Sequence, residues 1–112
     1  MSAVAILGVF VADTAYRAER QPRLGETILG SGFALGPGGK GSNQAVAAAR
    51  LGADVTFISK IGEDPFGDMA MALWAEAGAK TEVQQDPECY TGAASIFLED
   101  GSGDNAIIVC PG

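Results

Sequence analysis

The chain has 112 residues, with seven basic and fourteen acidic side chains and a net charge of −7. This length suits one small domain, and the 47% hydrophobic content is ordinary for a globular protein. An acidic chain gains no affinity from counterion release around nucleic acid, and it offers no basic stripe to an anionic membrane. The composition therefore argues against both as partners.

The first predicted element is a strand over residues 3–11. Nearly every position is apolar, which is typical of a strand covered on both faces in a parallel α/β sheet. The run is too short to span a bilayer, and no basic residue precedes it as in a signal peptide. The two cysteines, Cys89 and Cys110, lack metal-ligand spacing and indicate reduced thiols. We therefore expect a cytoplasmic protein.

The next stretch, from Asp13 to Gly36, lacks helical periodicity and contains three arginines, a proline and scattered glycines. It predicts two short, partly exposed strands, at about residues 15–20 and 26–35, that leave the main sheet. A helix is then predicted after GPGGKGSNQ, because QAVAAAR is rich in the best helix former. Ser42 or Asn43 is expected to cap this helix with a side-chain oxygen.

The segment DVTFISKIG predicts a strand, and a second helix follows it. Asp64 is expected to cap this helix with Pro65 at the first helical position, and Gly78 is expected to end it. Its apolar residues recur at helical spacing and predict core packing. These residues are Phe66, Met69, Leu73, Trp74 and Ala77.

The last predicted element is a β-hairpin over about residues 91–110, because EDGSGDN supplies turn residues between two β-type runs. The order of strands and helices predicts a doubly wound α/β core with a small additional β part. Two core strands and two helices are too few to cover such apolar strands. We therefore interpret the chain as the N-terminal part of a larger domain or as one that pairs with another chain.

The glycine-rich loop is the main candidate for function. Gly36, Gly38 and Gly41 match G-x-G-x-x-G, but no buried first strand precedes the loop, and no suitably placed acid follows to bind a ribose. A phosphate-binding P-loop also fails, since Gly41 stands where a magnesium-binding hydroxyl belongs. The remaining interpretations are a sugar-gripping loop or only a tight turn before a helix.

The residue types of the loop suit a polyhydroxylated ligand. Gly38 and Gly39 would let a sugar lie against the main chain. Lys40 supplies a mobile positive charge, and Asn43 offers a donor and an acceptor to hydroxyls. The N-terminus of the helix adds the positive end of its dipole.

The segment GPGGKGSNQAVAAARLGADVTFISKIGEDPFG, residues 36–67, resembles the N-terminal signature of the ribokinase-like (PfkB-type) carbohydrate kinases. LGVFVADTA, PRLGETILGSGFALG and TGAASIFLEDGSGDNAIIVCPG resemble the family's first strand and lid segments. The resemblance covers essentially the whole chain, but only about the first third of a typical member. It implies a doubly wound, ribokinase-like sheet core with a β lid, incomplete here, from strands at about residues 15–35 and 91–110.

The resemblance also implies roles for single residues. Asp13 would accept hydrogen bonds from sugar hydroxyls, and Gly38 and Gly39 would pack main chain on the sugar. Lys40 would touch the sugar or the transferred phosphate, and Asn43 would bridge hydroxyls. Val11 stands where ribokinases have an asparagine that also holds the sugar, so one polar contact is missing.

The family's catalytic base, its anion hole and nearly all of its ATP site match nothing in these 112 residues. The resemblance thus implies a kinase that uses ATP and Mg²⁺, with a monovalent cation as a further candidate, and that forms a homodimer through the lid. On this reading the present chain supplies the sugar-binding and lid part and is inactive alone. Three alternatives stay open: a non-catalytic sugar or nucleoside binder, a truncated remnant without activity, and a structural α/β piece.

Overall fold

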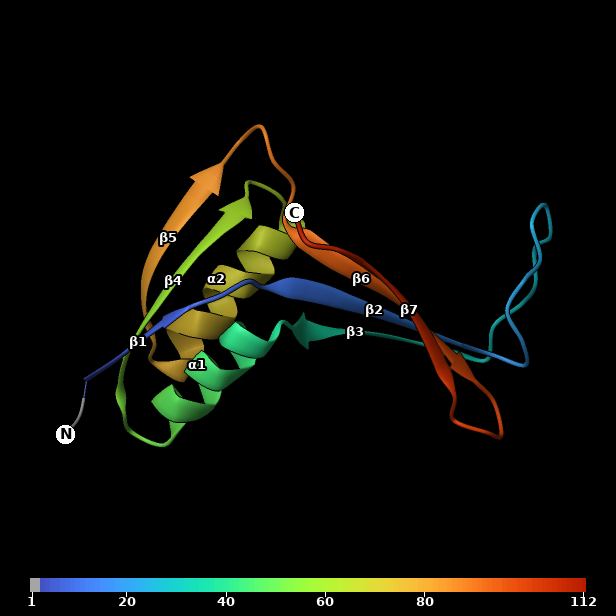
Figure 1. The fold of residues 1–112 in the computed structure, drawn as a ribbon, viewed down its shortest axis with the longest axis horizontal. Helices are drawn as coiled ribbons and strands as arrows, with labels where there is room; N and C mark the ends of the chain where they lie inside the picture. The colour runs from blue at the N-terminus through green and yellow to red at the C-terminus, as the bar shows by residue number, and fades with distance from the viewer. Residues whose placement is uncertain (1–2) are drawn as a thin grey trace.

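The computed structural model describes residues 3–112, which form two β-sheets and two helices (Figure 1). A parallel sheet has the strand order β1–β4–β5, and a mixed sheet has the order β3–β2–β6–β7. Both helices pack against the parallel sheet, and the mixed sheet extends away from it, so the longest dimension is 51 Å. In chain order the elements are β1 (Ala3–Leu7), β2 (Val11–Ala18), β3 (Gly32–Gly38), α1 (Lys40–Arg50), β4 (Asp54–Gly62), α2 (Pro65–Ala77), β5 (Lys80–Asp86), β6 (Gly92–Glu99) and β7 (Asn105–Cys110).

The parallel sheet confirms the predicted α/β class and contains one strand more than the two predicted. This strand, β5, pairs with β4 at the edge of the sheet. Its half-buried Thr81 and Val83 alternate with exposed polar residues. A strand with a single strongly apolar side chain has little periodic signal, which is why the sequence did not reveal it.

The predicted strand over residues 3–11 is wrong in its extent. The chain leaves the parallel sheet after β1 and enters the mixed sheet at Val11. At the crossing, Gly8 lies directly against Gly41 of α1, and a Cβ on Gly8 would come within 2.9 Å of the Gly41 Cα atom. This close contact lets the apolar run of residues 3–11 pass from the parallel sheet into the mixed sheet.

Within residues 3–112 only one face of this strand is covered, which agrees with the prediction that two core strands and two helices are too few to cover both faces. Leu7 and its register partner Ile58 are 80% and 38% exposed. Ile6 instead points into the core, where it packs beside Phe57. The two helices pack against each other and fill this one side of the sheet, so the opposite side stays open.

The mixed sheet holds the remaining strands. β2 pairs antiparallel with β3 and parallel with β6, and β7 pairs antiparallel with β6, which confirms the predicted hairpin. The strands predicted at residues 15–20 and 26–35 are wrong in their bounds, because β2 ends at Ala18 and β3 begins at Gly32.

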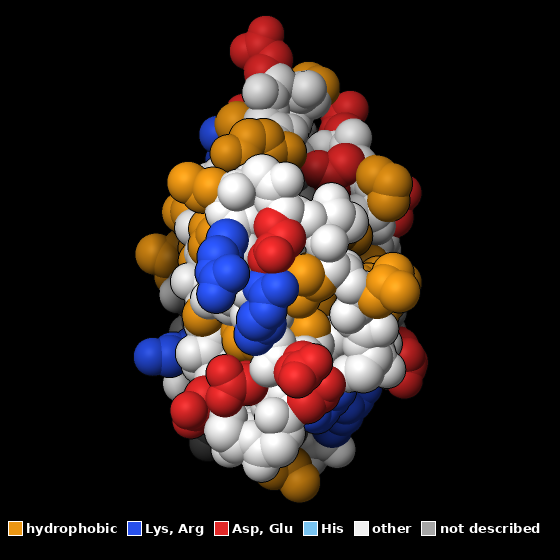
Figure 2. Space-filling view, turned by 90° about the vertical axis from the view of Figure 1, so that its right-hand side faces the viewer, with side chains coloured by type: hydrophobic (Ala, Val, Ile, Leu, Met, Phe, Trp, Pro, Cys, Tyr) orange, Lys and Arg blue, Asp and Glu red, His pale blue; other side chains and the backbone are white. Residues whose placement is uncertain are grey.

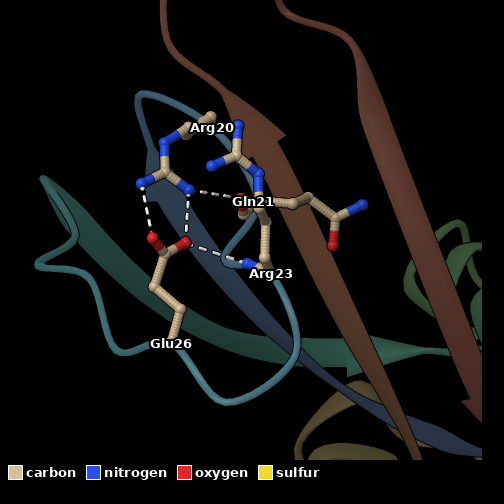
Figure 3. A network of polar contacts seen from close by, with 4 residues as sticks. All are labelled: Arg20, Gln21, Arg23 and Glu26. Carbon is tan, nitrogen blue, oxygen red and sulfur yellow. Dashed lines mark hydrogen bonds and ion pairs between the residues drawn. The ribbon is translucent and has the colours of Figure 1, made fainter.

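Residues 19–31 form a loop at the far end of this sheet (Figure 1). The Glu26 carboxylate pairs with the Arg20 guanidinium at 2.5 and 3.0 Å and accepts the Arg23 N–H at 2.9 Å (Figure 3). Arg20 also donates to the Gln21 carbonyl oxygen at 3.1 Å. Figure 2 looks onto this end, where basic and acidic side chains meet between hydrophobic ones. These local polar contacts replace the strand pairing that we expected here.

The sequence correctly predicted both ends of α2 but not the capping residue of α1. Asp64 caps α2 as predicted, since its Oδ1 accepts the Gly67 N–H at 2.8 Å, and Gly78 ends α2 in the left-handed conformation. The predicted cap of α1 is wrong. Gly39 is the capping residue, and neither Ser42 nor Asn43 forms a side-chain cap.

The core lies between the helices and the parallel sheet. Its largest fully buried side chains, with no more than 2% exposure, include Trp74, Phe10 and Phe57. The Trp74 ring lies 5.9 Å from Phe10 and 5.0 Å from Phe57, centroid to centroid. The predicted core role of Trp74 is therefore confirmed.

Candidate functional site

The glycine-rich loop runs from the end of β3 directly into α1, at the junction of the two sheets. Gly39 has a φ of +93°, which favours glycine, and a side chain there would overlap the carbonyl oxygen of Val9. The loop therefore needs glycine at this position to bring the N-terminus of α1 against the chain that enters β2. The positive end of the α1 dipole faces the same junction.

Asp13 and Gly38 are brought into direct contact. Asp13 lies in β2, and its carboxylate covers Gly38 at the end of β3. A Cβ on Gly38 would lie 2.5 and 2.6 Å from the two carboxylate oxygens of Asp13. Glycine at position 38 thus makes room for this carboxylate, which is half-buried.

Lys40 and Asn43 lie in the first turn of α1, and both are exposed. The Asn43 N–H donates to the Gly39 carbonyl oxygen at 2.9 Å, and the Asn43 side chain does not cap the helix. Lys40 takes part in none of the four ion pairs found among residues 3–112. Both side chains are thus available to a ligand at the start of the helix.

Three of the cavities within residues 3–112 are lined by residues other than the candidate site residues. The largest of these three, about 380 Å³, lies at the carboxyl ends of β1 and β4 and is bordered by Leu7, Lys60 and Tyr90. Of the candidate residues, Lys40 and Asn43 are exposed, Asp13 and Gly39 are half-buried, and Gly38 is buried under the Asp13 carboxylate.

Ser42 has a role in the core that its local sequence does not indicate. It is fully buried, and its Oγ accepts a hydrogen bond from the Trp74 Nε1–H at 2.9 Å. Serine near the start of a helix is usually a capping candidate, so nothing local indicates that this one faces the core. The partner is 32 residues away in sequence.

A second missed feature joins the two sheets. The Asp64 Oδ2 accepts the Thr91 N–H at 2.7 Å, and the buried Thr91 Oγ1 accepts the Gly62 N–H at 3.0 Å. Burial would raise the pKa of Asp64, but the hydrogen bonds from Thr91 and Gly67 outweigh it, and the pKa is lowered. These contacts connect the end of β4, the start of α2 and the start of β6.

Two further properties of residues 3–112 bear on partners. They contain no group of three or more acidic, cysteine or histidine side chains arranged to hold a metal ion. Neither of their two helices is long and apolar enough to cross a bilayer.

The family model described as pfkB family carbohydrate kinase matches residues 1–112. The chain belongs to this family. Members of the pfkB family with similar sequences include the ribokinase of Bacillus subtilis (strain 168), 37% identical over 112 residues, and that of Lactococcus lactis subsp. lactis (strain IL1403), 41% identical over 113 residues. Both alignments cover 100% of this chain.

The pfkB fold is also seen in solved structures. The structure of Arabidopsis thaliana ribokinase complexed with ribose and ATP superposes with a TM-score of 0.87 at 33% identity, over 95% of this chain and 35% of that one. The two bacterial relatives are likewise covered over only 38% and 37% of their lengths. The chain thus spans a little over a third of the relatives it matches, and it shows part of the ribokinase-like fold.

Proposed function

We propose that this chain is the N-terminal, sugar-binding part of an ATP-dependent kinase that phosphorylates a hydroxyl of ribose or a related sugar. The observation that carries the proposal is the contact of the Asp13 carboxylate with Gly38 beside the first turn of α1. A half-buried hydrogen-bond acceptor thus lies at the sheet junction where α1 begins with the exposed Lys40. The chain's membership of a carbohydrate kinase family supports sugar binding by these residues.

Each residue has a proposed role. Asp13 accepts hydrogen bonds from sugar hydroxyls, and Asn43 both donates to and accepts from them. Gly38 and Gly39 let the sugar ring approach the main chain. Lys40 contacts the sugar or offsets the negative charge on the oxygens of the transferred phosphoryl group.

We propose that the mixed sheet is a lid over the sugar, formed by the segments at about residues 15–35 and 91–110. Asp13 and Gly38 belong to this sheet, while Lys40 belongs to the helix beside it. A movement of the sheet would therefore close the site around its ligand. Closure would exclude water that could otherwise accept the phosphoryl group.

The resemblance implies that the catalytic base and most of the nucleotide site lie in the C-terminal part of family members. ATP would supply the γ-phosphoryl group, with Mg²⁺ and a monovalent cation held mainly by that part. The described residues do not fit a resident metal ion, because they offer no cluster of metal ligands. We therefore expect the 112-residue chain to be inactive alone.

The sugar itself is less defined than its site. Val11 is 7% exposed and lies two residues before Asp13, where ribokinases have an asparagine according to the resemblance. An aliphatic side chain cannot hydrogen bond to a hydroxyl. We therefore propose ribose or a related sugar with one polar contact fewer from this strand.

The proposal extends to location and assembly. Both cysteines are unpaired, which supports a reducing compartment such as the cytoplasm.

A homodimer through the lid is expected because the mixed sheet has exposed edges at β3 and β7 that need covering.

The test uses the complete gene product, ATP and a panel of sugars. Asp13→Ala and Asn43→Ala should each lower kcat/KM for the preferred sugar by about tenfold to a hundredfold, since each removes a hydrogen bond to substrate. Asp68→Ala in α2 and Gln84→Ala in β5, both exposed and outside the proposed lid segments, are the matched controls. If both site variants stay within about threefold of wild type, the site assignment is wrong.

The same assay tests the competing function. A protein that binds a sugar saturably but transfers no phosphate from ATP would be a binding module. Binding is read from the rise in Tm with sugar concentration, because a ligand of the native state stabilises it.

A further inference from the structure

We propose that Trp74 is a positioning residue for the candidate sugar site, which it supports from the core side. The proposal rests on the proposed function. It goes beyond the core role of Trp74, because the indole contacts both segments that carry the site residues. One of these segments is the first turn of α1, and the other is the chain that enters β2.

The first contact is the hydrogen bond from Trp74 Nε1–H to Ser42 Oγ, at 2.9 Å between two side chains with 0% exposure. Ser42 lies between Lys40 and Asn43 in the first turn of α1. A buried indole N–H needs its acceptor, since leaving it unpaired costs about 1–3 kcal/mol. The bond therefore fixes the rotation of α1 about its axis, and with it the directions of Lys40 and Asn43.

The second contact is an edge-to-face packing of Trp74 against Phe10, with ring planes at 85°. Phe10 is 2% exposed and directly precedes β2, whose third residue is Asp13. The position of Phe10 in the core thus sets where β2 begins, and hence where the Asp13 carboxylate meets Gly38.

A third contact anchors the indole itself. Phe57 of β4 packs against Trp74 with ring planes at 53°, and Phe57 is fully buried. β4 is the central strand of the parallel sheet and α2 lies beside α1 (Figure 1). One rigid side chain therefore ties both halves of the site to the most constrained strand. Misplacement of a binding group by about 1 Å can lower catalysis by about a hundredfold.

Replacing an ordinary core tryptophan would lower only stability, whereas replacing a positioning residue would also change sugar binding. The two roles can therefore be told apart by experiment. Trp74→Phe keeps a ring in the core but removes the N–H donor, and Ser42→Ala removes the acceptor. Val55→Ala is the control. Val55 is 1% exposed and pairs with Val4, at the end of the parallel sheet away from the glycine-rich loop. The substitution should therefore lower stability without altering the site.

The variants are made in the complete gene product and assayed below their Tm. Trp74→Phe and Ser42→Ala should each raise the sugar KM by about fivefold or more, while the ATP KM stays within about twofold. The double variant should be no more than about twofold worse than the worse single one, because both remove the same bond. Val55→Ala should change neither KM.

A second readout does not depend on activity. The Asn43 N–H donates to Gly39 at 2.9 Å, and its hydrogen exchange reports on the first turn of α1. Exchange should become about tenfold faster in both Trp74→Phe and Ser42→Ala than in Val55→Ala. If the wild type phosphorylates no sugar, the proposed function fails, and this exchange still decides the positioning role.

Two results would overturn the proposal. The first is an unchanged sugar KM in both variants with a loss of Tm like that of Val55→Ala. The second is equal Asn43 exchange in all three variants. Either would reduce Trp74 to a packing residue.

Discussion

At the scale of single residues, the contact between Asp13 and Gly38 relates the sequence most directly to the proposed activity. Four glycines occur between positions 36 and 41, but they are not equivalent. Gly39 is needed for its positive φ, whereas Gly38 is needed for the space that the Asp13 carboxylate fills. At Gly36 a Cβ would meet nothing within 4 Å.

Gly38→Ala should therefore displace the Asp13 carboxylate. We expect the sugar KM of the complete gene product to rise by about tenfold, with a loss of about 1–3 kcal/mol in stability from overpacking. Gly36→Ala, two residues earlier in the same strand, is the matched control and should leave both unchanged. Steady-state kinetics and urea denaturation measure the two effects, and equal behaviour of the two variants would contradict this role for Gly38.

A second residue-scale prediction concerns Glu26. The hydrogen bond from the Arg20 guanidinium, followed by that from the Arg23 N–H, lowers the pKa of Glu26 from 4.5 to about 2. The folded-state pKa is depressed, so the ion pair contributes above about pH 4.5 and its contribution is lost as the pH falls through about 2. The pair is exposed, so this contribution is small.

NMR titration of the Glu26 side-chain carboxyl carbon measures this pKa. In Arg20→Met the midpoint should return toward 4.5, because the strongest donor is gone. A titration that is the same with and without Arg20 would show that the network drawn in Figure 3 does not persist in solution.

At the scale of elements, Asp64 connects a helix cap to the meeting of the two sheets. One oxygen accepts the Gly67 N–H of α2, and the other accepts the Thr91 N–H before β6. The sequence predicted the cap, because an aspartate before a proline at the start of an apolar helix is a local signal. It did not reveal Thr91, which is 27 residues further along the chain.

Asp64→Ala should therefore cost more than the loss of a helix cap alone, which is about 1 kcal/mol. We expect about 2–4 kcal/mol, because the buried N–H of Thr91 also loses its acceptor. Asp68→Ala is the control, since Asp68 is an exposed acid in the first turn of the same helix. The free energy of unfolding in urea tests this, and a cost no greater than that of Asp68→Ala would rule out the connecting role.

At the scale of the whole molecule, the mixed sheet carries an exposed apolar face. Tyr16 and Phe33 face each other across β2 and β3 with ring centroids 5.3 Å apart, and they are 48% and 63% exposed. Pairing registers put Leu35 and Ile108 on the same face, 48% and 70% exposed. Exposed apolar surface of this kind is typical of an interface, and the proposed occupant is the same sheet of a second copy.

Phe33→Ser combined with Ile108→Ser should convert a dimer of the complete gene product into monomers, because both changes remove apolar area from this face. Sedimentation equilibrium measures the molecular mass. Leu24→Ser is the control, since Leu24 is fully exposed in the loop of residues 19–31. A dimer that survives the double substitution would place the interface elsewhere.

The sequence by itself determined what depends on neighbouring residues. The cap at Asp64, the end of α2 at Gly78 and the hairpin after β6 follow from short-range backbone chemistry. The long ordered segment around the glycine-rich loop was sufficient to indicate the pfkB family.

Only the tertiary structure decided how these elements share space. The division of the first apolar run depends on Gly41, which is 33 positions after Gly8, and β5 is a strand because β4 lies beside it. Ser42 faces the core because Trp74 is there to donate to it. Such contacts join residues far apart in the chain, and periodicity and local propensity contain no information on which distant side chains will meet.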